Sequence, residues 1–440
     1  MKRIFVATLA LATLFACNKD ITNENSSIED KVWVEFTAGI DTKASLVEGD
    51  KVTPHTITWE VDDLIAVNGE TLKASEAGSK TTFTGEVGPA FLDAASYKAI
   101  YPRAAGTSFD AVTVEHEQDA VANGFDDIVA VAYSTTRSLN FKHVTSLIRF
   151  QVPSDFANIT EVNFTADEAL AGVVKVTHDS ADGNPAVKVT TAENTVTLKG
   201  TFEAEKDYYV AVLPGAKTNL VVRINGYLSK RYPTATIPTS GVGNMGELPA
   251  PVASGYSICS SKTGWDFNNM TPMYNDIDGY FVAKNVDVEY FSIFHKAVTG
   301  WGDDRRYGPD GGEIAVSGLA KWNTTTNKNA NAFLVSDPNK KYDVYFNLTN
   351  NKVYIADAGI SLPDESNVFS LIGLGGEWNN LDVVCVKYDN TRYVARNIVI
   401  PSGGFKVRKN YSWDHSWGYG TITALDTKYT LNQKAENNIK

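Results

Sequence analysis

The sequence predicts an all-β, multidomain chain of antiparallel β-sandwiches. Short runs in which apolar and polar residues alternate are its main periodic signal, and Gly, Asn, Asp and Pro clusters separate these runs. No stretch shows the 3.6-residue period of a long helix, and the aromatic content of 11% suits strands. The 440 residues are enough for roughly three or four domains.

The N-terminus reads as a targeting segment. A basic start at Lys2 and Arg3 precedes an apolar stretch, 4–15, that is too short to span a bilayer. This stretch ends in Leu14-Phe15-Ala16-Cys17, which resembles a bacterial lipobox. We therefore expect residues 1–17 to be a lipoprotein signal peptide, Cys17 to be lipidated and residues 18–31 to form a flexible tether. The alternative is a plain secretory signal with a chance cysteine.

Several runs in the remaining chain have the alternation of half-buried strands. They are 32–36, 147–152, 208–213, 342–346 and 352–355. Between the last two, Thr349-Asn350-Asn351 is typical of a tight hairpin turn, because Asn tolerates a positive φ.

Charge and cysteine content exclude several classes of protein. The net charge is −12 and no basic run is present, so a nucleic-acid partner is not expected. Besides Cys17, only Cys259 and Cys385 remain, without a CxxC or Cys/His cluster. We expect neither a disulfide framework nor a structural zinc site, and no metal or cofactor.

The first half of the chain carries five motifs in a fixed order. They begin at Thr58-Trp59, Thr81, Ala99-Ile100-Tyr101-Pro102, Asn140 and Tyr209. Together they resemble the fimbrillin family of Bacteroidetes, whose members are pilus subunits or cell-surface lipoproteins. The resemblance implies two β-sandwiches, at 32–152 and 153–250, and it does not imply catalysis.

The second half contains a tandem duplication. Gly264-Trp265-Asp266 is echoed by Glu377-Trp378-Asn379, and the loop ending in Trp301 is echoed by the loop ending in Trp413. The two tryptophans of a pair are about 36 and about 35 residues apart, and the repeat period is near 112. Linkers at 249–255 and 360–365 delimit two modules, 255–358 and 366–440.

These repeats resemble the starch-binding modules of Sus-type surface lipoproteins (the SusE/SusF class). The resemblance implies small immunoglobulin-like modules in which aromatic platforms bind glycan. An indole presents a flat face to the apolar C–H face of a sugar, and it loses little conformational entropy on binding. The candidate glycan-binding residues are Trp265, Trp301, Lys296, Arg305, Arg306 and Tyr307 in the first module, and Trp378, Trp413, Arg408, Asp414 and Trp417 in the second.

A structural role is the alternative for some of these tryptophans. Immunoglobulin-like sandwiches often bury one Trp in the core, and Trp265 and Trp378 could each be that residue. Trp301 and Trp413 are expected to lie in exposed loops. Trp322 lies outside the shared signature and is expected to be structural.

The second module looks shortened. The hairpin that closes the first module ends about 54 residues after Trp301, and the same offset from Trp413 falls beyond Lys440. We therefore expect module 366–440 to lack its last two strands.

The functional prediction is a non-catalytic, lipid-anchored protein of the outer-membrane surface. It would capture a starch-like α-glucan or another neutral polysaccharide for uptake, with an outer-membrane glycan transporter complex as a partner. The first alternative is a fimbrial accessory or adhesin subunit. An enzyme is a third possibility, although no HExxH, GxSxG or P-loop motif is present. His143 is expected to make local hydrogen bonds and not to act in catalysis.

Overall fold

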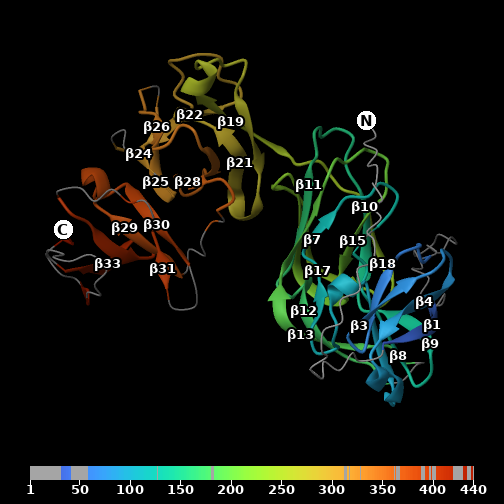
Figure 1. Cartoon of the computed structure of the whole chain (residues 1–440). Helices are drawn as coiled ribbons and strands as arrows, with labels where there is room; N and C mark the ends of the chain where they lie inside the picture. Colours follow the sequence, from blue (N-terminus) through green and yellow to red (C-terminus); the bar gives the residue numbers. More distant parts are fainter. Residues whose placement is uncertain are drawn as a thin grey trace, which may run out of the picture.

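A computed structural model shows a nearly all-β chain with several sheets (Figure 1). The structure describes residues 31–40, 58–125, 127–179, 183–311, 315–316, 318–327, 329–360, 362, 367–387, 392–395, 398, 403–419, 430–433 and 438–439. The expected signal peptide, Cys17 and almost all of the tether lie outside these residues. The described helices are short 3-10 helices of three to five residues: η2 (Pro89–Asp93), η3 (Arg103–Ala105), η4 (Ser261–Thr263), η5 (Ile277–Gly279) and η7 (Leu374–Gly376). The all-β multidomain prediction is confirmed.

The first sheet closes into a barrel. Its strands, in order around the barrel, are β1 (Val32–Ile40), β4 (Lys80–Val87), β3 (Glu70–Ala74), β2 (Leu64–Val67), β5 (Tyr97–Tyr101), β8 (Ala130–Ser134) and β9 (Ser138–His143). β1 closes the barrel, because it pairs antiparallel with β4 and parallel with β9. We expected a sandwich here. Closure leaves this sheet without an edge strand.

Trp59 lies at the centre of the barrel core. Its ring meets Phe83, Tyr101 and Phe141 edge-on at 5.0, 5.0 and 5.2 Å between centroids. His143 at the end of β9 is also buried, and neither ring nitrogen has a hydrogen-bond partner among the described residues. The local hydrogen bonds expected for His143 are therefore not found, and burial lowers the pKa of its imidazole to about 4.

Three further sheets form the second body of the first half. Their strand orders are β15 (Tyr208–Val212), β10 (Ser146–Gln151) and β18 (Val242–Glu247); β17 (Tyr227–Ile237), β16 (Gly215–Ile224), β11 (Glu161–Thr165), β14 (Thr195–Lys199) and β7 (Glu117–Asp119); and β13 (Ala186–Glu193), β12 (Ala171–Thr177) and β6 (Val112–Val114). One apolar core draws residues from all three sheets.

The division of the first half differs from the expected boundary at Pro153. β6 and β7 precede that boundary but pair with β12 and β14, which follow it. β10 also precedes it and pairs with β15 and β18. Such pairings join strands about 60 or more residues apart, so local alternation does not reveal them.

The C-terminal half is one continuous sheet. Its strands, in order, are β24 (Ala315–Val316), β26 (Phe333–Val335), β22 (Tyr290–His295), β19 (Ala253–Ser260), β20 (Thr271–Asn275), β21 (Tyr280–Asp287), β27 (Lys341–Asn347), β28 (Lys352–Asp357), β25 (Leu319–Thr326), β30 (Leu381–Lys387), β29 (Phe369–Ile372), β32 (Lys406–Lys409), β33 (Ser412–Gly418) and β34 (Asn432–Gln433). β23 (Arg306–Pro309) bridges β22 and β25, and β31 (Tyr393–Val394) pairs with β30.

The predicted hairpin is confirmed in this sheet. β27 and β28 pair antiparallel from Tyr342↔Asp357 to Asn347↔Lys352, and Asn351 in the turn has a φ of 50°.

The two modules are joined edge to edge, because Leu319–Trp322 of β25 pair with Leu381–Val384 of β30. This joint was not expected from the linker at 360–365, of which residues 361 and 363–365 lie outside the described part of the chain. Most of residues 420–440 also lie outside it, so the shortened second module stays a prediction.

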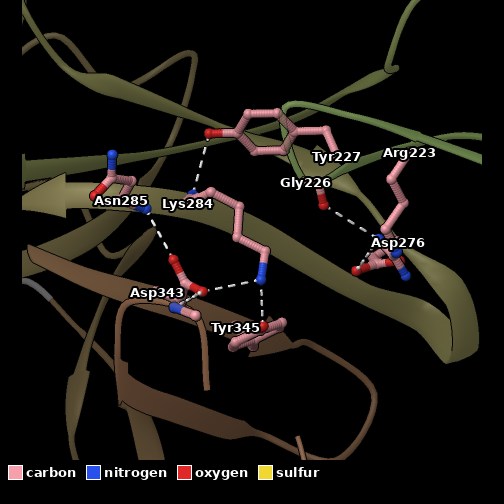
Figure 2. Close-up of polar contacts among 9 residues, drawn as sticks. Arg223, Gly226, Tyr227, Asp276, Lys284, Asn285, Asp343 and Tyr345 are labelled. Atoms are coloured by element: carbon pink, nitrogen blue, oxygen red, sulfur yellow. Dashed lines mark hydrogen bonds and ion pairs between the residues drawn. The ribbon is translucent and has the colours of Figure 1, made fainter. Parts of the chain in front are cut away.

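Polar contacts fix the first half against the first module (Figure 2). Arg223 at the end of β16 donates two hydrogen bonds to the Asp276 carboxylate, at 3.0 and 2.7 Å. The Tyr227 hydroxyl accepts a hydrogen bond of 3.1 Å from the Lys284 backbone N–H. The Lys284 ammonium in turn bonds Asp343 at 3.0 Å and the Tyr345 hydroxyl.

Aromatic rings close the same junction. Phe156 and Tyr227 of the first half both contact Tyr274 of β20, with centroid distances of 5.8 and 4.5 Å. A bidentate ion pair together with packed rings restricts the motion of the first half relative to the first module more than a linker alone does. The segment at 249–255 therefore joins two bodies that are held together at this contact.

Candidate functional site

The first tryptophan pair comes from the loop after η4 and the loop between β22 and β23. Trp265 follows η4, and its backbone N–H donates a hydrogen bond of 2.9 Å to the Ser260 carbonyl. Trp265 has a φ of 59°, which is uncommon for a bulky residue. Gly264 before it also has a positive φ, of 64°. Asp266 then fixes the loop, because its carboxylate accepts a hydrogen bond of 2.9 Å from the Asn268 N–H. Strain of this kind clusters at functional sites.

Trp301 rests on a bed of aromatic rings. It meets Trp265 at 5.2 Å and 62°, and it also contacts Phe267 and Phe294 at 5.6 and 5.8 Å between centroids. The Arg306 guanidinium lies over the Trp301 ring at 4.8 Å. Even so, 52% of Trp301 remains exposed. The ring is thus fixed in place and still open to solvent.

The charges around Trp301 largely cancel. Arg305 binds Asp303 through an Nε hydrogen bond of 2.9 Å and a second contact from its terminal nitrogen. The hydrogen bond from the Arg305 side chain is the main reason why the pKa of Asp303 falls to about 2. Arg306 donates to the Ser292 hydroxyl at 3.2 Å, and Lys296 is exposed.

Tyr307 does not belong to the exposed site. It lies in β23 at 9% exposure, where its ring packs against Phe346 and Tyr256 at 4.9 and 5.8 Å. Tyr307 is next to exposed residues in sequence, but β23 is a strand, and successive side chains of a strand point to opposite faces. Tyr307, expected among the glycan-binding residues, is therefore part of the core and does not lie at the exposed surface. Trp322 is fully buried in the same core, as expected.

The second tryptophan pair has a different geometry. Trp378 and Trp413 stack with their planes 28° apart and their centroids 6.4 Å apart. Trp378 lies against Gly373, where an added Cβ would come within 2.5 to 2.7 Å of the indole. Glu377 fixes its loop, because one carboxylate oxygen accepts from the N–H groups of Asn379 and Asn380, both at 3.0 Å.

Trp413 is the exposed member of this pair. It is 43% exposed, and the Arg408 guanidinium lies 5.2 Å from its ring centroid. We expected Trp413 in a loop, but it lies on β33. Asp414 beside it is exposed. Trp417 on the same strand is half-buried, and its ring lies 6.1 Å from that of Phe369.

Arg408 is buried and not a free rim residue as we had expected. It is 3% exposed and binds the fully buried Asp382 carboxylate through Nε at 2.8 Å and through a second nitrogen. Ser370 donates to the same carboxylate at 2.7 Å, and Lys321 of the first module lies 3.8 Å from it. A ligand hydroxyl that displaced Arg408 would therefore break a buried bidentate ion pair, leaving Asp382 only Ser370 and Lys321.

Sequence reasoning missed this carboxylate cluster. Asp382 stands in the apolar run Leu381–Lys387, where a charged residue between Leu381 and Val383 signals a buried partner. Tyr411 was missed as well. The Lys321 ammonium lies 4.6 Å from its ring centroid, and its hydroxyl is 2.9 Å from the hydroxyl of Tyr354.

No three His, Cys, Asp or Glu side chains of the described residues gather where they could hold a metal ion. In that same part of the chain, no helix is long and apolar enough to cross a membrane. Cys259 and Cys385 are buried free thiols, and burial raises the pKa of Cys385 to about 11.

Comparison with known proteins gives only distant structural similarity. No family model matches the chain, and no curated protein matches it. A candidate cell adhesion protein of Bacteroides ovatus is 14% identical, with 55% of this chain and 95% of that one covered and a TM-score of 0.30. A candidate cell adhesion protein of Bacteroides uniformis is 15% identical (46% and 82% covered, TM-score 0.26).

The tip fimbrial protein Mfa3 of Porphyromonas gingivalis, with C-terminal truncation, is also similar. It is 10% identical, with 48% of this chain and 82% of that one covered and a TM-score of 0.23. At TM-scores of this size the similarities carry no argument about the role of any residue.

Proposed function

We propose that the chain is a non-catalytic, cell-surface glycan-binding protein that captures polysaccharide through two tryptophan pairs. The observation that carries this proposal is the half-exposed state of Trp301 and Trp413 on supports that hold both rings still. Each of these indoles is supported from beneath and presents a flat apolar face that a ligand can cover.

The chemistry of each pair suits a sugar. The π face of an indole attracts the C–H groups on the apolar face of a pyranose ring, and a fixed indole loses little entropy when it binds. Phe267 and Phe294 support Trp301, while Trp378 and Arg408 support Trp413. A sugar would cover the exposed part of each ring.

The surroundings favour a neutral glycan, such as a starch-like α-glucan. Asp303 neutralises Arg305, and Asp382 neutralises Arg408. These two arginines are therefore not free to bind a polyanionic chain. Lys296, Arg306 and Asp414 remain as side chains that could reach hydroxyl groups at the rim of a sugar.

Two sites on one chain would act together on a polymer. A site that buries a few sugar units binds weakly, whereas the second contact on the same polymer forms at a high effective concentration. In this proposal a lipid on Cys17 tethers the chain to the outer membrane. The first half then holds the platforms away from the surface, near a glycan transporter complex.

Affinity gel electrophoresis against a polysaccharide panel tests the proposal. One neutral glycan should retard the chain, and Trp301→Ala and Trp413→Ala should each weaken the retardation about tenfold or more. Trp33→Ala is the matched control, because Trp33 is 60% exposed on β1, far in sequence from either pair. Near-ultraviolet circular dichroism checks folding. No retardation by any glycan, or equal loss in the Trp33 variant, would contradict the proposal.

A fimbrial accessory or adhesin subunit is the second candidate. The edge strand β13 favours it: six of its eight residues are exposed, and it lies at the end of its sheet. An unpaired strand edge can accept a strand from another molecule. In that case Val189→Lys on β13 would abolish higher-order ladders on native gels, while the Trp301 and Trp413 variants would leave them unchanged.

A further inference from the structure

The strand β13 leaves one side of its sheet open. It lies at the end of the order β13-β12-β6, so among the described strands only β12 pairs with it. Six of its eight residues are exposed. Val189 is 39% exposed, although it lies opposite Val174, which is fully buried. An open strand edge of this length presents unpaired backbone groups and apolar surface to a strand of another molecule.

A bulge gives β13 a symmetric pattern of faces. The register against β12 shifts by one position at Thr190, which is an extra residue of β13. This residue shifts the alternation of side chains by one, so positions at equal distances from the bond between residues 190 and 191 face the same way. Val189 and Ala192 share one face of the sheet. Lys188 and Glu193 share the other face.

The charges of β13 favour a partner on the open side. Lys188 lies opposite Lys175 of β12, and the Lys175 ammonium already bonds the Asp110 carboxylate at 2.5 Å. Lys188 therefore has a cation and not a carboxylate as its cross-strand neighbour. Glu193, near the other end of β13, lies opposite the uncharged Ala171. Opposite charges directly across a strand pair stabilise it, whereas like charges destabilise it. Both charges would thus be matched by an opposite charge on an added strand.

From this pattern we infer that two copies of the chain pair antiparallel through β13, about a two-fold axis between residues 190 and 191. In that register Lys188 of each copy lies opposite Glu193 of the other copy. On the second face, the exposed Val189 is covered by Ala192 of the other copy. A contact that uses the same surface on both subunits closes with two copies, so it gives a dimer and no longer assembly.

The same features disfavour other strands. A lysine and a bulge on an edge strand both oppose pairing with most strands. In the symmetric register, however, Lys188 gains a carboxylate, and the bulge of one copy meets the bulge of the other. The inference does not depend on glycan binding. For the function proposed above, a dimer would double the number of tryptophan pairs that one polymer can reach.

Sedimentation velocity over a range of concentrations tests the inference on the full-length chain, with Cys17→Ala to prevent lipidation. This parent should pass from monomer to dimer as its concentration rises. Lys188→Glu and Glu193→Lys should each raise the dissociation constant about tenfold or more, because each sets two like-charged pairs across the interface. Lys230→Glu is the matched control, since Lys230 is exposed on β17, the edge strand of another sheet, and should leave the dimer intact.

Recombining the charges identifies the register. The Lys188→Glu, Glu193→Lys double variant restores both ion pairs in every dimer, and a mixture of the two single variants restores them between unlike chains. Both should dimerise as tightly as the parent, and misfolded chains could not produce this rescue. A parent that stays monomeric, a dimer that Lys188→Glu leaves intact, or failure of both rescues would overturn the inference. A series of higher oligomers would also overturn it, because a two-fold contact closes at two copies.

Discussion

The two C-terminal modules repeat the same sequence elements, yet they fix their tryptophans differently. In the first module Trp265 and Trp301 meet edge-on at 62°, and the covering Arg306 is half-buried and bonds Ser292. In the second, Trp378 and Trp413 stack at 28°, and the covering Arg408 is buried against Asp382. The first support is mainly aromatic, and the second is mainly ionic.

The covering arginine comes from opposite directions along the chain. Arg306 follows Trp301 by five residues, whereas Arg408 precedes Trp413 by five. What recurs is therefore a guanidinium over the exposed indole and not a position in the repeat. In the second module this arginine also connects to Lys321 of the first module through Asp382. The second site therefore depends on the joint between β25 and β30.

Asp382→Ala should have the largest effect. It leaves the buried cations Arg408 and Lys321 without their carboxylate, which typically costs about 3–5 kcal/mol of the free energy of unfolding. Urea denaturation measures the loss. Asp303→Ala is the matched control, because it removes the carboxylate from the exposed pair at the first site and should change stability little.

The two buried thiols show which module opens. In a Cys17→Ala chain, the three cysteines fall to two, Cys259 in the first module and Cys385 in the second. With Asp382→Ala, a thiol reagent should label Cys385 much faster than Cys259. Equal acceleration at both thiols would mean that the cluster stabilises the whole C-terminal half and that the two modules do not differ in this respect.

Alkaline pH should weaken the second module through Cys385. Burial raises the pKa of this thiol from 9.0 to about 11, so the folded chain keeps its proton where the unfolded chain loses it. The free energy of unfolding keeps its full value below pH 9, falls as the pH rises from 9 to 11 and levels off above pH 11. The total loss is about 3 kcal/mol. The measurement is the difference in urea denaturation between the parent and Cys385→Ala from pH 8 to 11. If the free energies of unfolding of the two chains fall in parallel with pH, Cys385 is not the group responsible for the alkaline loss.

Local patterns gave the strands and the tryptophan spacing, but not the contacts between distant segments. Alternation predicted β10, β15 and the β27–β28 hairpin, and the repeat located the two tryptophans of each pair. Nothing local indicated that β6 and β7 pair with strands of the second body, or that β25 pairs with β30. Tyr307 is buried because β23 pairs with β22 and β25, and Arg408 is buried against Asp382 of β30. Neither contact shows in the local pattern, so both residues were expected at the binding surface.

Gly373→Ala should disturb only the second pair. The new Cβ would lie 2.5 Å from the Trp378 indole, and the φ of 96° adds backbone strain. We expect a loss of about 1–3 kcal/mol and a displaced Trp378 ring, with about tenfold weaker glycan binding at this site. Gly302→Ala is the matched control, since it has the same φ of 96° but open space around it.

Comparing the two alanine variants separates strain from collision. Calorimetry should find a similar strain cost in both, and affinity electrophoresis should find weaker binding only with Gly373→Ala. If Gly302→Ala weakens glycan binding as strongly, backbone strain and not collision with the Trp378 ring explains the loss. The two modules would then not differ in how their rings are supported.

The smallest effect is expected from Arg306→Gln. This change removes the guanidinium over Trp301 but leaves the aromatic bed intact, and a cation–π contact at an exposed site contributes about 0.5–1 kcal/mol. Glycan affinity of a Trp413→Ala chain, in which only the first site remains, should fall about two- to fivefold by affinity electrophoresis.

Arg305→Gln is the control for that change, because Arg305 is an adjacent arginine whose charge is taken up by Asp303. It should leave affinity unchanged. An equal loss in both variants would assign the effect to net charge near the site. The guanidinium over the indole would then be incidental in the first module and a consequence of the Asp382 cluster in the second.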